Sequence, residues 1–239
     1  WRKVRRGLSA GRVQSAALKI ICDRDNEIKN FKPEEFWVIN ADFQKDKVFT
    51  AKLTECQGKK LSINNEEQNN AVLEELKKNP YIVNSLDEKD RIRKAPAPFT
   101  TSSMQQDAAN KINFSTRKTM MVAQQLYEGI EIKGHGTIGL VSYIRTDSVR
   151  ISDEAKAQAR EYILEKMGEE YYSNNIYKNR KGDVQDSHEA IRPSHIELEP
   201  DEIKDSLSRD QYKLYKLIWN RFLASQIAPA RFKAVNAGI

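Results

Sequence analysis

The fold of this chain is organised around one stretch, Gly139-Leu140-Val141-Ser142-Tyr143-Ile144-Arg145-Thr146-Asp147-Ser148. Its apolar first half predicts a β-strand over 139–144. Residues two apart on a strand share a face, so Arg145 is expected beside Tyr143. A phenol is a weak nucleophile at neutral pH, and a neighbouring cation can activate it or neutralise charge on a phosphate under attack. An ordinary strand aromatic with a polar tip explains the same two residues, so they do not decide the matter alone.

A second cluster is Ser187-His188-Glu189-Ala190-Ile191-Arg192-Pro193-Ser194-His195. On a helical turn, His188 and Arg192 would be neighbours four residues apart and could hold one phosphate. His188 could also transfer a proton, because imidazole titrates near neutrality. A capped turn with solvent-facing charges is the alternative. No acidic or thiol partner stands at ligand spacing from His188 and His195, so we expect no metal site there.

The third cluster is Ser9-Ala10-Gly11-Arg12-Val13-Gln14, which follows a basic N-terminal segment. Gly11 lets the backbone approach a ligand closely, and the polar side chains around it can donate to phosphates or bases. A helix that begins here would add the positive end of its dipole. A basic loop that caps a helix is the alternative.

Asp23, Asp25 and Glu27 form a D-x-D-x-E pattern, a spacing that can hold magnesium. Such carboxylates converge on extended backbone but point apart on a helix. Apolar residues recur at helical spacing over 13–30, so we interpret this pattern as a solvated helix surface.

Composition narrows the function classes. The 239 residues carry a net charge of +6, with 39% hydrophobic and 31% charged residues, which is typical of one large or two smaller globular domains and compatible with a polyanionic partner. Two cysteines, Cys22 and Cys56, make neither a disulfide framework nor a zinc site, which favours the reducing cytoplasm. The sequence contains no P-loop, signal peptide or membrane-length apolar run. It opens at Trp1 in mid-pattern, so we expect a piece of a longer protein.

The remaining pattern predicts an α+β chain. Strands are expected over 36–43, 48–53 and 81–86 with a polar helix over 65–78, and Ala95-Pro96-Ala97-Pro98 marks a boundary. The segment after it is mostly helical. Its expected elements are a helix over 102–112 with a capping box of Ser102 and Gln105, helices over 115–128 and 152–167, a polar loop over 173–187, a short helix at Pro200 and a long helix from Ser208 to before Pro229.

Taken together, these segments resemble bacterial DNA topoisomerase I, a type IA topoisomerase. Each match is modest alone, but they occur in the order of the family and cover most of the chain. The matching segments are Gly7–Ser15, Phe36-Trp37, Ala97–Ser102, Lys118–Met121, Gln125–Gly129, Gly139–Ser148 and His188–Ser194.

The resemblance implies an enzyme that cleaves one DNA strand, passes another strand through the break and rejoins it without ATP. It implies that Tyr143 is the nucleophile, which leaves a 5′-phosphotyrosine, and that Arg145 and His188 are catalytic. It implies DNA-binding roles for residues 9–14, Arg192 and Asp147. It also implies that magnesium binds an N-terminal Toprim domain that is absent from this sequence, so we expect no cofactor within it and no activity from it alone.

The same resemblance implies a multidomain fragment of a toroidal enzyme. Residues 1–35 would be part of the single-strand groove domain. Residues 36–94 with 230–239 would be part of a β-rich hinge domain. Residues 95–229 would form a helical domain with a helix-turn-helix-like core that carries Tyr143. The expected partners are single-stranded and negatively supercoiled DNA, the expected state is a monomer without membrane attachment, and the expected location is the cytoplasm, on the nucleoid.

Other interpretations stay open. Topoisomerase III and reverse gyrase are type IA relatives, although the residues around Tyr143 and the 129–139 segment are more similar to topoisomerase I. In tyrosine recombinases and type IB enzymes the nucleophile follows an H-x-x-R element, whereas here Tyr143 precedes an H-x-x-x-R element. A non-catalytic helix-turn-helix DNA-binding module is the alternative from another class.

Overall fold

A computed structural model describes residues 11–44, 46–177 and 188–239. The chain divides into two compact units: unit 1 comprises 1–87 and 236–239, and unit 2 comprises 88–235. Helices occur together with small two-stranded sheets, which confirms the predicted α+β class. None of the helices in the described ranges is long and apolar enough to span a membrane.

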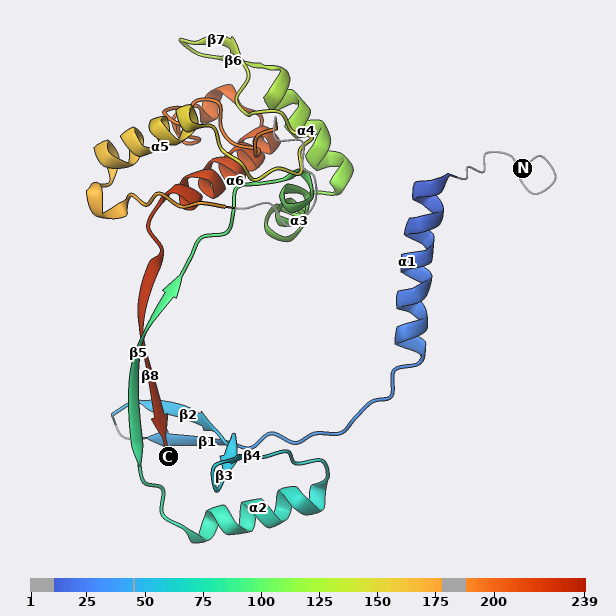
Figure 1. The fold of residues 1–239 in the computed structure, drawn as a ribbon, viewed down its shortest axis with the longest axis vertical. Helices are drawn as coiled ribbons and strands as arrows, with labels where there is room; N and C mark the ends of the chain where they lie inside the picture. Colours follow the sequence, from blue (N-terminus) through green and yellow to red (C-terminus); the bar gives the residue numbers. More distant parts are fainter. Residues whose placement is uncertain (1–10, 45, 178–187) are drawn as a thin grey trace, which may run out of the picture. The chain divides into compact units, whose positions relative to one another are not determined.

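In its described residues, unit 1 contains the hairpins β1–β2 and β3–β4 and the helices α1 and α2 (Figure 1). Strand β1 (Asn40–Gln44) pairs antiparallel with β2 (Val48–Lys52), and β3 (Glu55–Cys56) pairs with β4 (Lys59–Lys60). Phe43 packs its ring against Phe49 at 5.4 Å and against Tyr81 at 5.0 Å between ring centroids. Helix α2 (Glu66–Lys78) begins after Asn65, whose side chain accepts a hydrogen bond from the Gln68 amide.

Helix α1 (Arg12–Lys29) has no buried residue. Its acidic residues form ion pairs with lysine or arginine three or four residues away, as is typical of a solvated helix surface. The pairs are Lys19–Asp23, Arg24–Glu27 and Asp25–Lys29, and every partner is more than half exposed. The interpretation of the D-x-D-x-E pattern as helix surface is therefore confirmed.

Strand β5 (Ser85–Arg93) pairs with β8 (Ala230–Gly238), and the boundary between the two units falls within both strands. Every residue of β5 is exposed. The predicted strand over 81–86 is wrong in its position, because the strand begins at Ser85 and continues through charged residues. A ribbon that buries neither face needs only backbone pairing, so it leaves no apolar alternation in the sequence.

Unit 2 is built around α6 (Arg209–Gln226), which packs against α3 (Thr101–Ile112), α4 (Thr116–Glu128) and α5 (Asp153–Lys166) (Figure 1). Single-turn 3₁₀ helices, η1 (Glu169–Tyr171) and η2 (Lys204–Ser206), complete its helical elements in the described ranges. Its core includes Phe99, Met104, Leu126, Leu140, Ile144, Ile163, Leu214, Tyr215, Ile218 and Phe222.

The starts of these helices follow local side-chain caps. Ser115, Ser152 and Ser208 each accept a backbone N–H from the first turn, as their helix-initiating positions predict. The capping box predicted for Ser102 and Gln105 is wrong, because Thr100 and Ser103 form it and α3 begins one residue earlier. The short helix expected at Pro200 is a turn, and η2 follows it.

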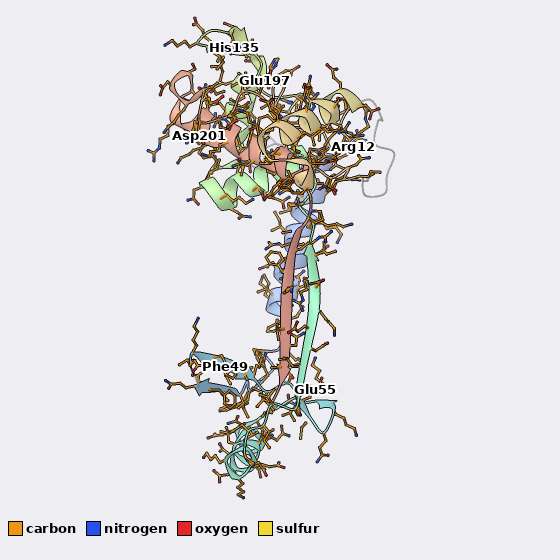
Figure 2. All side chains as sticks on the ribbon, turned by 90° about the vertical axis from the view of Figure 1, so that its left-hand side faces the viewer. Arg12, Phe49, Glu55, His135, Glu197 and Asp201 are labelled. Carbon is orange, nitrogen blue, oxygen red and sulfur yellow. The ribbon has the colours of Figure 1, made fainter. Side chains whose placement is uncertain are left out.

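Strands β6 (Ile130–Ile132) and β7 (Gly136–Ile138) form a hairpin that projects from the helices of unit 2. His135 lies in its turn between Gly134 and Gly136, both at positive φ, and is labelled in Figure 2. The chain returns from this hairpin into the stretch that carries Tyr143.

Candidate active site

The stretch 139–148 is not a regular strand, so the strand predicted over 139–144 is wrong. Its only ladder contact in the described ranges is an isolated bridge between Val141 and Pro193, and bends follow. The Ser142 amide donates to the Arg192 carbonyl (2.9 Å) as part of this bridge, and the Leu140 amide donates to the Leu126 carbonyl at the end of α4 (2.8 Å). Backbone bonds to two separate segments therefore hold the stretch, without a continuous strand ladder.

Side chains in this stretch alternate between solvent and core. Tyr143, Arg145 and Asp147 are exposed. Ile144, Thr146 and Ser148 are buried. The predicted nucleophile and the predicted cation are thus both exposed, with 46% of Tyr143 accessible. Among the described residues, Arg145 has no ion-pair or hydrogen-bond partner, so its charge is available to an anion.

Thr101, in the first turn of α3, anchors the segment. Its hydroxyl donates to the Ile144 carbonyl (2.7 Å) and accepts from the Thr146 amide (2.9 Å). Its own amide donates to the Thr146 carbonyl (2.9 Å). These bonds hold the backbone on both sides of Arg145, so a helix terminus more than 40 residues away in sequence sets the position of this arginine.

Residues 188–194 lie beside this segment in extended conformation, so the helical turn proposed for His188 and Arg192 is wrong. Ile191 bridges to Phe99, and the Ser142 hydroxyl donates to the Ala190 carbonyl (2.8 Å). Ala190 and Ile191 are fully buried. Burial of these two residues requires extended pairing with two separate segments, which a helical turn could not provide.

Arg192 is engaged by its own segment. Its Nε and Nη2 atoms lie 2.9 Å from Oε2 of Glu189, and Nη1 donates to the Pro193 carbonyl (3.0 Å). Burial raises the pKa of Glu189, but a hydrogen bond from Ser152 and the charges of Arg192 and Arg150 outweigh it and lower the pKa below its ordinary value. Glu189 is therefore held in its charged form, in an ion pair with Arg192.

The Tyr143 ring is flanked by two other rings. Tyr127 meets it edge to face at 5.6 Å between centroids, with 67° between the planes. His188 lies 6.3 Å away at 43°. Tyr143 and His188, which sequence reasoning linked only through the family, are thus neighbours in space.

The segment 9–14 belongs to unit 1. Ser9 and Ala10 lie outside the described residues. Gly11 is the N-cap of α1 on extended backbone, and Arg12, Val13 and Gln14 form the first turn. Among the described residues, those that contact Tyr143 or hold its segment belong to unit 2.

The histidines and acidic residues do not gather into a metal site in the part of the chain that the structure describes. Within 11–44, 46–177 and 188–239, no group of three or more His, Cys, Asp or Glu side chains could hold a metal ion. His195 Nδ1 lies 3.2 Å from Oε1 of Glu197, an exposed pair. The donor sets in the described residues do not fit a magnesium site.

Sequence reasoning missed three residues that build the site: Thr101, Ser142 and Glu189. Thr101 was noted only within the matching segment 97–102, just before the expected helix, and the partners of Ser142 lie about 50 residues away. Glu189 and Arg192 are three residues apart and oppositely charged, but the segment is not helical, so helical spacing does not explain their ion pair.

Comparisons with known proteins show the family to which the chain belongs. All of residues 1–239 match a family model described as DNA topoisomerase. A structure described as full-length topoisomerase I from Thermotoga maritima is 40% identical in sequence, with a TM-score of 0.76. The match covers 96% of this chain and 36% of that chain, so the present chain spans little more than a third of that relative.

Proposed function

The chain belongs to the DNA topoisomerase family, and we propose that it supplies the nucleophile of a bacterial type IA topoisomerase that relaxes negatively supercoiled DNA. The observation that supports this is the exposed Tyr143 ring, with His188 beside it and Arg145 two residues on, which has no ion-pair or hydrogen-bond partner among the described residues.

The chemistry assigned to these residues is a transesterification. The Tyr143 Oη attacks a phosphorus atom of single-stranded DNA, the bond from phosphorus to the 3′ oxygen breaks, and a 5′-phosphotyrosine with a free 3′-hydroxyl results. The phosphodiester count is conserved, so rejoining by the same hydroxyl needs no ATP. Arg145 would neutralise the charge that gathers on the phosphate oxygens. His188 would exchange the proton of the attacking or leaving oxygen, the role imidazole performs near neutral pH.

The metal expected for this reaction is not assigned to any residue of this chain. The D-x-D-x-E carboxylates are paired with cations of their own helix and do not fit it. Magnesium would be held by a Toprim domain elsewhere in the longer protein, where it would supply positive charge to the scissile phosphate. We therefore propose that residues 1–239 bind DNA but do not cleave it alone.

The remaining assignments concern DNA. The segment 9–14, Arg192 and Asp147 are proposed DNA contacts, and single-stranded DNA in negatively supercoiled molecules is the proposed substrate. The protein is proposed to act as a monomer on the nucleoid in the cytoplasm. Because Glu189 holds its guanidinium group, Arg192 would contact a phosphate only through the part of that group that remains exposed.

Covalent trapping tests the nucleophile. The full-length enzyme with magnesium is incubated with a 5′- or 3′-labelled single-stranded oligonucleotide, and denaturation then traps any protein–DNA adduct. A 5′-phosphotyrosine joins the protein to the fragment that contains the 3′ end of the oligonucleotide. Wild-type protein should therefore carry the 3′ label and not the 5′ label, and Tyr143→Phe should carry neither. Tyr171→Phe is a matched control, because Tyr171 is an equally exposed tyrosine (49%) outside the site. An adduct with Tyr143→Phe would show that another residue is the nucleophile.

Arg145 is tested by separating cleavage from binding. Arg145→Ala should reduce the single-turnover cleavage rate by about 10²-fold, as expected for loss of a charge that stabilises the transition state, while the Kd for the oligonucleotide changes little. Arg145→Lys keeps the charge and serves as the control. Equal losses in rate and affinity would make Arg145 a binding contact instead.

A non-catalytic helix-turn-helix module remains the second candidate. It is favoured by α3 and α4, which are joined by a short turn at Asn113, a residue in the left-handed region (φ 55°). Sequence-specific duplex binding without any adduct from the full-length wild type would support it over the enzyme.

A further inference from the structure

Tyr127 is a second exposed phenol beside the proposed nucleophile, and the reaction proposed above gives it no role. It stands in the last turn of α4, and 39% of it is accessible. Its ring meets the Tyr143 ring edge to face at 5.6 Å. Edge-to-face pairs of this kind have a preferred geometry, so they orient both rings.

The backbones that carry the two rings are tied together. The Leu140 amide caps the Leu126 carbonyl, and a side chain at Gly139 would come within 2.7 Å of the Tyr127 carbonyl oxygen. This close approach brings the 139–143 segment against the end of α4. Because α4 is packed through Val122, Ala123 and Leu126 into the core, Tyr127 is presented from a rigid element.

Tyr143 has little else to hold its ring. Its hydroxyl forms no hydrogen bond with any residue in the described part of the chain, and about half of its surface is exposed. Apart from His188, which lies farther away at 6.3 Å, Tyr127 is the ring that contacts it. A nucleophile must point its oxygen along the line of attack, and a freely turning side chain spends little time in that orientation.

We infer that Tyr127 is a positioning residue that orients the Tyr143 phenol for attack through an edge-to-face ring contact. This inference rests on the proposed function. The contact uses the ring of Tyr127 and not its hydroxyl, which forms no hydrogen bond with the described residues, so phenylalanine should replace it.

The test compares variants of the full-length enzyme in single-turnover cleavage of a labelled oligonucleotide. Tyr127→Leu should slow cleavage by about 3- to 10-fold, the range that an edge-to-face contact sets, and Tyr127→Phe should restore the wild-type rate. The Kd for the oligonucleotide, measured in a Tyr143→Phe background, should be the same with and without the Tyr127→Leu substitution. Met121→Ala controls for truncation on the same helix, because Met121 is exposed (56%) and has no ring contact with Tyr143.

Three outcomes would overturn the inference: a wild-type cleavage rate for Tyr127→Leu, an equal defect in Tyr127→Phe, or a loss of affinity that matches the loss of rate. The second would point to the hydroxyl and the third to a DNA contact. These outcomes are distinct from failure of the proposed function, which would appear as adduct formation by Tyr143→Phe.

Discussion

Replacement of Thr101 by valine should release the segment that carries Tyr143 and Arg145. Valine has nearly the shape and helix propensity of threonine, so the change isolates the hydroxyl. It removes the acceptor of the Thr146 amide and the donor to the Ile144 carbonyl. The Thr100–Ser103 capping box at the start of α3 does not use this hydroxyl.

The size of the effect of Thr101→Val follows from the burial of Thr146. Thr146 is only 7% exposed, so its amide is poorly placed to replace the lost bond with water. A buried polar group without a partner costs about 1–3 kcal/mol. A cost of about 2 kcal/mol corresponds to an increase of about 30-fold in the equilibrium constant for local opening of the segment, at roughly 1.4 kcal/mol per factor of ten.

Hydrogen exchange measures this opening directly. The Thr146 amide of Thr101→Val should exchange about 30-fold faster than in the wild type when peptides over 140–150 are followed by mass spectrometry. Thr101→Ser keeps the hydroxyl and should stay close to the wild type. Unchanged exchange in Thr101→Val would refute the anchoring role. Equal acceleration in both variants would assign the effect to the methyl group.

Three further perturbations test other contacts. Glu189→Gln should lower the melting temperature at pH 7, and its difference from the wild type should shrink as the pH falls below 4.5. A carboxyl whose pKa is lowered on folding stabilises the folded state above its ordinary value of 4.5 and loses this contribution as the pH falls through its folded-state pKa. Calorimetry as a function of pH would show a higher melting temperature for the variant at pH 7 if the charge were unfavourable. Gly139→Ala should lower the free energy of unfolding by about 1–3 kcal/mol, because its Cβ would meet the Tyr127 carbonyl oxygen; an unchanged urea midpoint would mean that the segment shifts freely. Tyr215→Phe should lower the free energy of unfolding by about 1–2 kcal/mol, because the buried hydroxyl donates to the Leu198 carbonyl (2.8 Å). An unchanged free energy of unfolding in urea denaturation would contradict a stabilising role for this bond.

Helices of unit 2 could be predicted from sequence because their signals are local. Ser115, Ser152 and Ser208 lie at the start of their helices and make bonds within three residues. Gly129 ends α4 at positive φ, where glycine is favoured. Each of these interactions is closed within one turn, so no distant segment is needed to form it.

The two errors at the candidate site depend instead on contacts with distant segments. Apart from the Leu140–Leu126 bond, the 139–148 stretch is held to other segments by Thr101 and by residues around Arg192, each more than 40 positions away. The 188–192 stretch is extended because Ala190 and Ile191 are buried against separate segments. Periodicity describes one element at a time, so it could not report which distant backbone would satisfy these groups.

For this protein, the order of residues was enough to place most helix ends, and it selected Tyr143, Arg145 and His188 as the residues to examine. The packed fold was needed to show that Tyr143 is exposed, that Tyr127 and His188 flank it, and that Glu189 restrains Arg192. The physical reason is the separation along the chain of the residues that interact. Capping acts over three or four residues of chain, whereas ring contacts and buried polar bonds join positions that meet only after the core around α6 has packed.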